Sequence, residues 1–159
     1  MDFDLINIGI ADIAVSTSPH ILRTILGSCV GICIYDPQIK AGGLAHIMLP
    51  TSKKSSNNLK KYADTAIPFM IDEMIKLGSN KTRMVVKLTG GATMFKHMEN
   101  SLAGDIGLNN INSARGVLSN LGIPILSEDV GGDYGRTIDF YLETGVVKIK
   151  ANGMDPKTI

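Results

Sequence analysis

Short apolar segments of strand length recur along this chain and outnumber the segments with helical periodicity. Runs rich in β-branched residues, separated by Gly, Asn, Asp or Pro, are typical of strands joined by tight turns. They do not alternate one for one with helices, so a regular βαβ repeat is not expected. The expected strands cover residues 5–15, 21–26, 29–35, 40–49, 82–88, 123–130, 137–142 and 146–151.

Two segments have the periodicity of amphipathic helices. The first, residues 59–77, repeats apolar residues at spacings of three and four and is followed by Gly78. Pro68 should kink or interrupt this helix, because proline removes an internal hydrogen-bond donor. The second covers residues 110–121 and is followed by Gly122. Together the patterns predict an α+β fold in which mixed β-sheets are covered by two main helices.

The composition indicates one packed domain over residues 1–159, with residues 152–159 as a loose tail. Apolar residues make up 44% and charged residues 19%, which does not suit a disordered chain. A net charge of +1 and an aromatic share of 5% argue against binding of nucleic acid. The longest nearly apolar run, residues 26–35, is too short to span a membrane, which takes roughly 20 residues. The acidic start does not resemble a signal peptide, so we expect a cytoplasmic protein without membrane insertion.

The two cysteines, Cys29 and Cys33, are expected to be free thiols. On a strand their Cα atoms lie about 13 Å apart at roughly 3.3 Å per residue. A disulfide requires a Cα separation below about 7 Å. The three histidines are scattered at His20, His46 and His97, and with two cysteines they do not have the spacing of a structural zinc site.

The pair with the clearest chemical use is Cys29 and His46. If residues 36–39 close a hairpin in which Tyr35 pairs with Lys40, Cys29 lies directly opposite His46, with Cβ atoms about 4.5–5.5 Å apart. An adjacent imidazole lowers the pKa of a thiol, and the thiolate is the nucleophile. From pattern alone, the commoner alternative is a small buried hydrophobic residue at Cys29 and a hydrogen-bonded core histidine at His46.

Three neighbouring residues extend this hypothesis. Gly27 and Ser28 allow the chain to bend before Cys29, so that the backbone N–H groups of Ser28 and Cys29 can hold an oxyanion. The hydroxyl of Thr24 can orient the imidazole as the third member of a triad. Threonine is also a common strand residue without any further role. The glycine-rich segments 90–92 and 131–136 match neither a P-loop nor a dinucleotide fingerprint.

With these motifs the sequence resembles the CheD family, the chemoreceptor glutamine deamidases of bacterial and archaeal chemotaxis. The family's catalytic Cys and His correspond to Cys29 and His46. Its third catalytic residue, a Thr, corresponds to Thr24, although an ungapped count places Arg23 there. Asn109 stands where the family usually has Arg. The resemblance follows the family order over nearly the whole chain, through residues 26–30, 45–50, 62–64, 90–92, 106–107, 128–132 and 134–136.

The resemblance implies a four-layer α/β/β/α sandwich similar to toxin-type cysteine deamidases. It also implies hydrolysis of specific glutamine side chains to glutamate in methyl-accepting chemotaxis receptors by a Cys–His thiol mechanism, without a metal or cofactor. A partner similar to CheC, a phosphatase of the response regulator CheY, is implied as well. Two alternatives stay open. One is a non-catalytic module that docks such a phosphatase, and the other is a small-molecule amidohydrolase that uses Cys29 and His46.

Overall fold

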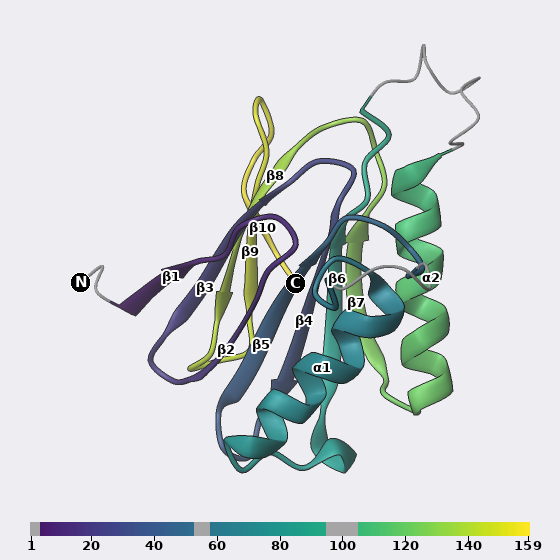
Figure 1. Cartoon of the computed structure of the whole chain (residues 1–159). Helices are drawn as coiled ribbons and strands as arrows, with labels where there is room; N and C mark the ends of the chain where they lie inside the picture. The colour runs from purple at the N-terminus through teal and green to yellow at the C-terminus, as the bar shows by residue number, and fades with distance from the viewer. Residues whose placement is uncertain (1–3, 53–57, 95–104) are drawn as a thin grey trace.

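The computed structural model describes residues 4–52, 58–94 and 105–159, which form two five-stranded mixed sheets and two α-helices (Figure 1). The first sheet contains, in order, β1 (Leu5–Asn7), β3 (Ile21–Leu26), β8 (Arg136–Tyr141), β9 (Val147–Lys150) and β10 (Lys157–Thr158). The second sheet contains, in order, β2 (Ile13–Thr17), β5 (Ala41–Ile47), β4 (Val30–Asp36), β6 (Val85–Gly90) and β7 (Ile125–Val130). The β1–β3 and β6–β7 pairs are parallel and the other pairs are antiparallel, so the predicted α+β class with mixed sheets is confirmed.

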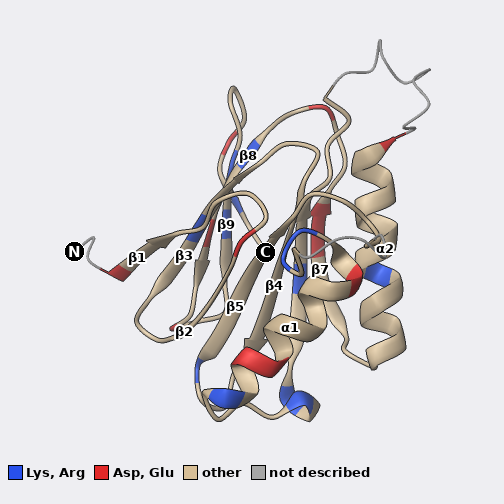
Figure 2. Ribbon diagram, in the orientation of Figure 1, with Lys and Arg blue, Asp and Glu red and all other residues tan. Residues whose placement is uncertain are grey.

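The second sheet is central because β4 and β5 are buried on both faces. Neither strand has a charged residue apart from Asp36 at the end of β4 (Figure 2). The odd-numbered side chains of β4, such as Cys33, meet the first sheet in one apolar core. The even-numbered ones, such as Ile32, meet the helices in a second core. Near-continuous apolar runs are typical of strands covered on both sides.

Both helices, α1 (Ala63–Lys76) and α2 (Ile106–Leu121), cover the same face of the second sheet (Figure 1). The layers are therefore α/β/β, and not the expected α/β/β/α: within the described residues no helix covers the outer face of the first sheet. The alternation in β9 explains this, because Val147 and Ile149 are buried while Lys148 and Lys150 face solvent. None of the described helices is long and apolar enough to cross a membrane.

Several element boundaries differ from the sequence predictions. The expected strand 5–15 is divided between the two sheets, and Ala11 in the connection has a φ of 59°. Pro68 does not interrupt α1, which continues to Lys76. Helix α2 begins a turn earlier than expected, where the Asp105 side chain accepts the N–H of Leu108. The expected loose tail contains β10, which pairs with β9.

The register of the β4–β5 hairpin also differs from the prediction. Asp36 pairs with Ala41, and Gly31, not Cys29, lies opposite His46. The predicted direct opposition of Cys29 and His46 is therefore wrong. The new partner is two residues along the strand, and side chains alternate with a period of two, so both residues keep the predicted face.

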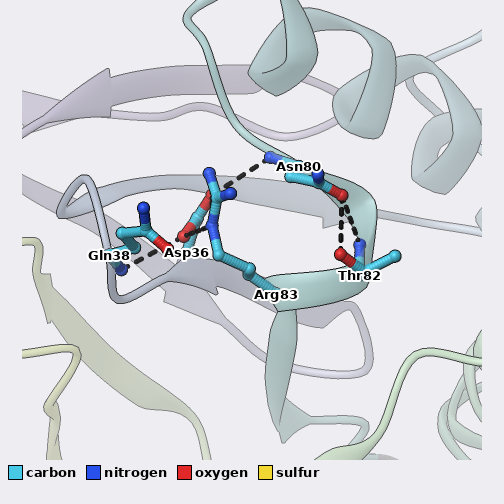
Figure 3. A network of polar contacts seen from close by, with 5 residues as sticks. All are labelled: Asp36, Gln38, Asn80, Thr82 and Arg83. Atoms are coloured by element: carbon cyan, nitrogen blue, oxygen red, sulfur yellow. Dashed lines mark hydrogen bonds and ion pairs between the residues drawn. The ribbon is translucent and has the colours of Figure 1, made fainter.

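The carboxylate of Asp36 accounts for this register. It is fully buried and accepts hydrogen bonds from the N–H groups of Gln38 and Asn80 (Figure 3). The guanidinium of Arg83 pairs with it at 2.9 Å. These partners hold Asp36 as the last paired residue of β4, and the loop then ends at Lys40 with a φ of 50°. Arg83 and Asn80 are far along the chain, so the local turn sequence alone does not reveal their effect.

Candidate active site

Residues 27–29 form the crossover from β3 in the first sheet to β4 in the second. The side chain of Cys29 is partly buried against the core between the two sheets. All three carbonyl groups of the crossover accept hydrogen bonds, which hold it in one conformation. The N–H of Ala92 donates to the carbonyl of Gly27 at 3.0 Å, and the N–H of Gly91 donates to the carbonyl of Cys29 at 2.8 Å. The side-chain amide of Asn110 donates to the carbonyl of Ser28 at 3.2 Å.

The glycine at the end of β6 is required by this crossover. Gly90 has a φ of 97°, and a Cβ atom there would lie 2.4 Å from the carbonyl oxygen of Cys29. A side chain at this position would therefore displace the backbone of Cys29. The glycine-rich segment 90–92 supports the crossover through close backbone contact, which agrees with its lack of a phosphate-binding motif.

His46 lies on β5 and faces the first sheet, where its Nδ1 is 2.7 Å from the hydroxyl oxygen of Thr24. The Thr24 hydroxyl donates its single hydrogen to the carbonyl of Ile8, also at 2.7 Å. It must therefore accept from His46, which places the imidazole proton on Nδ1. Nε2 is then the basic nitrogen. It is buried and has no hydrogen-bond partner among the described residues.

Cys29 and His46 both face the core between the sheets, Cys29 from the bend just before β4 and His46 from β5. Gly31 lies opposite His46 and two residues after Cys29. Gly31 itself has no side chain, and the apolar side chains of Leu26 and Ile138 lie over it, because a Cβ atom at Gly31 would be 3.0 Å from Leu26 and 3.1 Å from Ile138. The thiol and the imidazole therefore share one region at the edge of the core between the sheets.

The electrostatics of the site favour uncharged groups at rest. Burial lowers the pKa of His46 to about 4. Burial also raises the pKa of Cys29 above its ordinary value. At neutral pH the pair is therefore a thiol and a neutral imidazole, and not a thiolate–imidazolium ion pair. Such a pair suits a reaction in which His46 removes the thiol proton as the new bond forms.

The other sequence candidates lie apart from this pair. Arg23, the alternative to Thr24, is on the opposite face of β3 and pairs with Asp139 at 2.6 Å between Nε and Oδ1. Cys33 is a free thiol that is 1% exposed, and burial raises its pKa strongly. Sequence reasoning did not identify Asn110, whose side chain contacts the crossover. Its signal was a polar residue in the apolar stripe of a helix.

Comparison with known proteins identifies the family to which this chain belongs. Residues 48–151 match the family model described as CheD chemotactic sensory transduction. A protein of Caldanaerobacter subterraneus named "Probable chemoreceptor glutamine deamidase CheD" is 50% identical over the full length of both chains. A protein of the same name from Clostridium novyi is 48% identical over 100% of this chain and 100% of its own. Another from Methanococcus maripaludis is 46% identical over 98% of this chain and 99% of its own. The chain belongs to the CheD family.

The match to the CheD family model begins two residues after His46, whereas the full-length relatives also cover Thr24, Cys29 and His46. Among solved structures, Bacillus licheniformis YfiH is similar with a TM-score of 0.51 and 19% identity. That likeness covers 74% of this chain and 50% of YfiH. The similarity to YfiH concerns the fold alone.

Proposed function

We propose that this CheD-family chain is a chemoreceptor glutamine deamidase that uses Cys29 as its nucleophile. The relatives' names supply the substrate class. One observation carries the mechanism: Nε2 of His46 is buried, unprotonated and without a partner among the described residues, while Thr24 holds the opposite nitrogen. A buried imidazole that only stabilised the core would be expected to have both nitrogens bonded.

The acylation step uses the thiol and the imidazole together. Nε2 of His46 removes the proton of Cys29 while Sγ attacks the carboxamide carbon of a glutamine side chain. The N–H groups of Ser28 and Cys29 donate to no other described residue and are available to the oxyanion. The imidazolium then donates its proton to the amide nitrogen, ammonia leaves, and a thioester remains.

The deacylation step returns the enzyme to its starting state. Nε2 of His46 removes a proton from water, and the hydroxide attacks the thioester carbon. The C–S bond breaks, the thiol regains a proton from the imidazolium, and glutamate is released. The cycle consumes one water and produces one ammonia, and no step requires an oxidant or reductant. The docking of a CheC-like phosphatase stays a prediction of the family resemblance.

Mass spectrometry of a purified receptor fragment incubated with the protein tests the proposal directly. We expect individual glutamines to become glutamate with wild-type protein. Unchanged glutamines after prolonged incubation with receptor fragments from the same organism would contradict the proposed function. The docking-module alternative predicts this negative result together with an unreactive Cys29 thiol.

Free glutamine is expected to be a poor substrate compared with a receptor fragment. The side chains that lie over Gly31 on the face of the pair, Leu26 and Ile138, are apolar and buried, and offer no charge for an amino acid's ammonium and carboxylate groups. Arg23, the nearest sequence candidate for such a charge, pairs with Asp139. A folded partner would supply contacts away from the reacting amide, and these contacts would position the amide for attack by Cys29.

Ammonia release measures this preference. We expect kcat/KM for the receptor fragment to exceed that for free glutamine by more than tenfold, which corresponds to about 1.4 kcal/mol of transition-state binding. Comparable values for both substrates would favour the small-molecule amidohydrolase alternative.

The resting protonation states predict an unusual pH profile for a Cys–His enzyme. Because activity requires neutral His46, whose pKa is about 4, kcat/KM should persist to about pH 4 and fall below it. The raised pKa of Cys29 predicts no thiolate absorbance in the ultraviolet at neutral pH, measured as wild type minus Cys29→Ala. A thiolate signal at neutral pH that disappears when His46 is replaced would instead show an ion pair.

A further inference from the structure

Asn110 connects the two halves of the proposed site. It lies in α2, is fully buried, and its Nδ2 is 3.2 Å from the carbonyl oxygen of Ser28 and 2.9 Å from that of Met48. Ser28 precedes the nucleophile, and Met48 follows His46 by two residues. Two carbonyl acceptors match the two hydrogens of one amide group, and the reversed amide would place its oxygen against both carbonyls.

The peptide geometry gives this contact a consequence for catalysis. In a planar trans peptide the C=O of one residue and the N–H of the next point in opposite directions. Asn110 holds the C=O of Ser28, so the N–H of Cys29 points away from Asn110. We propose that Asn110 is a positioning residue that aims the Cys29 N–H at the oxyanion. This inference rests on the proposed deamidase function.

The surroundings of Asn110 fix its position. Gly107 lies one turn earlier in α2, and a Cβ atom there would lie 2.5 Å from the carbonyl oxygens of both Gly91 and Ala92. Gly91 and Ala92 are the residues whose N–H groups hold the crossover. The helix therefore packs directly on the segment that supports the nucleophile, and Asn110 adds the third bond to the crossover.

The remaining atom of the Asn110 amide argues against a purely stabilising role. Oδ1 is buried and has no hydrogen-bond partner among the described residues. Burying an unpaired amide oxygen is unfavourable for folding. The benefit of an asparagine here therefore comes from what its NH₂ group holds, which is the orientation of the Ser28–Cys29 peptide relative to the end of β5.

Asn110→Leu tests the proposal because it keeps the approximate size and removes both donors. We expect kcat on a receptor fragment to fall by about a hundredfold, the usual effect of losing one oxyanion donor, with KM changed less than about threefold. The alkylation rate of Cys29 by iodoacetamide should also stay within about threefold, because Thr24 and His46 are intact. Asn112→Leu, at an exposed asparagine of the same helix, is the matched control and should change none of these.

A second measurement does not depend on deamidation. Protein labelled with nitrogen-15 cysteine has two backbone amide signals, Cys29 and Cys33, which Cys33→Ala assigns. Asn110→Leu should shift the Cys29 signal and leave the Cys33 signal in place, whereas Asn112→Leu should move neither. If Asn110→Leu does not fold, Asn110→Ser, which retains one donor for two carbonyls, is measured in its place with the same expectations.

The outcomes separate this inference from the proposed function. An unmoved Cys29 amide signal, or unchanged kcat in an active enzyme, would overturn the role of Asn110. A parallel loss of kcat and of alkylation would also overturn it, because the damage would then extend beyond the oxyanion donor. Absence of deamidation by the wild-type protein would overturn the proposed function, and the amide signals would still decide whether Asn110 orients the peptide.

Discussion

Replacing Cys29 with alanine is expected to lower the deamidation rate by at least about 10⁴-fold, as loss of a covalent nucleophile does in other enzymes. The substitution removes Sγ, so no thioester forms. The hydrogen bonds that hold the crossover involve the carbonyl groups of residues 27–29 and do not use this side chain. We therefore expect a folded protein that has lost its chemistry, measured as the fraction of glutamine converted in a receptor fragment.

Cys33→Ala is the matched control for this experiment. Cys33 is the same residue type and faces the same core between the sheets, but it is 1% exposed and its raised pKa keeps it protonated. We expect activity within about threefold of wild type and a modest loss of stability from the smaller core residue. Full activity in Cys29→Ala, or a loss in Cys33→Ala of the size predicted for Cys29→Ala, would exclude Cys29 as the nucleophile.

The alternation of side chains explains why the candidate pair could be found from the sequence while its register could not. Cys29 and His46 belong to apolar runs on either side of a turn, and a two-residue error in pairing leaves both on the same face. The register itself depends on Asp36, whose carboxylate is held by Asn80 and Arg83. These are tertiary contacts that a local turn pattern does not contain.

The division of residues 5–15 between two sheets has a similar origin. Its alternating isoleucines are consistent with one long strand, because β1 and β2 both belong to sheets that border the same inner core. The break occurs at Ala11, an alanine with a positive φ, and not at the glycine or proline that usually marks such a turn. The N–H of Ala11 bonds the carbonyl of His46, which stabilises that turn beside the site.

The order of the layers was visible in the sequence only in part. The continuous apolar runs of β4 and β5 correctly indicate strands covered on both faces. The alternation of Val147 and Ile149 with Lys148 and Lys150 is the corresponding signal that β9 has one solvent face. The family resemblance suggested a fourth layer, but these lysines are better suited to water than to a covering helix.

The hydroxyl of Thr24 is the feature that distinguishes a positioned base from a packed histidine. It accepts from Nδ1 of His46 and donates to the carbonyl of Ile8, so both of its hydrogen-bonding roles are used. Thr24 lies in β3 of the first sheet and Ile8 directly follows β1 of the same sheet, whereas His46 lies in β5 of the second sheet. The contact therefore fixes the tautomer of the base across the space between the sheets.

Thr24→Val is expected to lower kcat by about 10²- to 10⁴-fold, the upper end being the effect of disrupting the tautomer in a serine-protease triad. Valine has nearly the shape of threonine but cannot accept from Nδ1, so the imidazole is free to carry its proton on Nε2, where it is not a base. KM should change little, because no substrate contact is removed. The unpaired carbonyl of Ile8 and imidazole N–H should lower the free energy of unfolding by about 1–3 kcal/mol.

Thr24→Ser, which keeps the hydroxyl, should recover most of kcat, and Thr17→Val, at an exposed threonine of β2, should have no effect. Steady-state kinetics on a receptor fragment, with thermal unfolding of each variant, separates a positioning role from a packing role. A folded Thr24→Val protein with kcat within about threefold of wild type would show that His46 does not depend on this hydroxyl. A loss of kcat that serine does not recover would instead assign the effect to packing around the Thr24 methyl group.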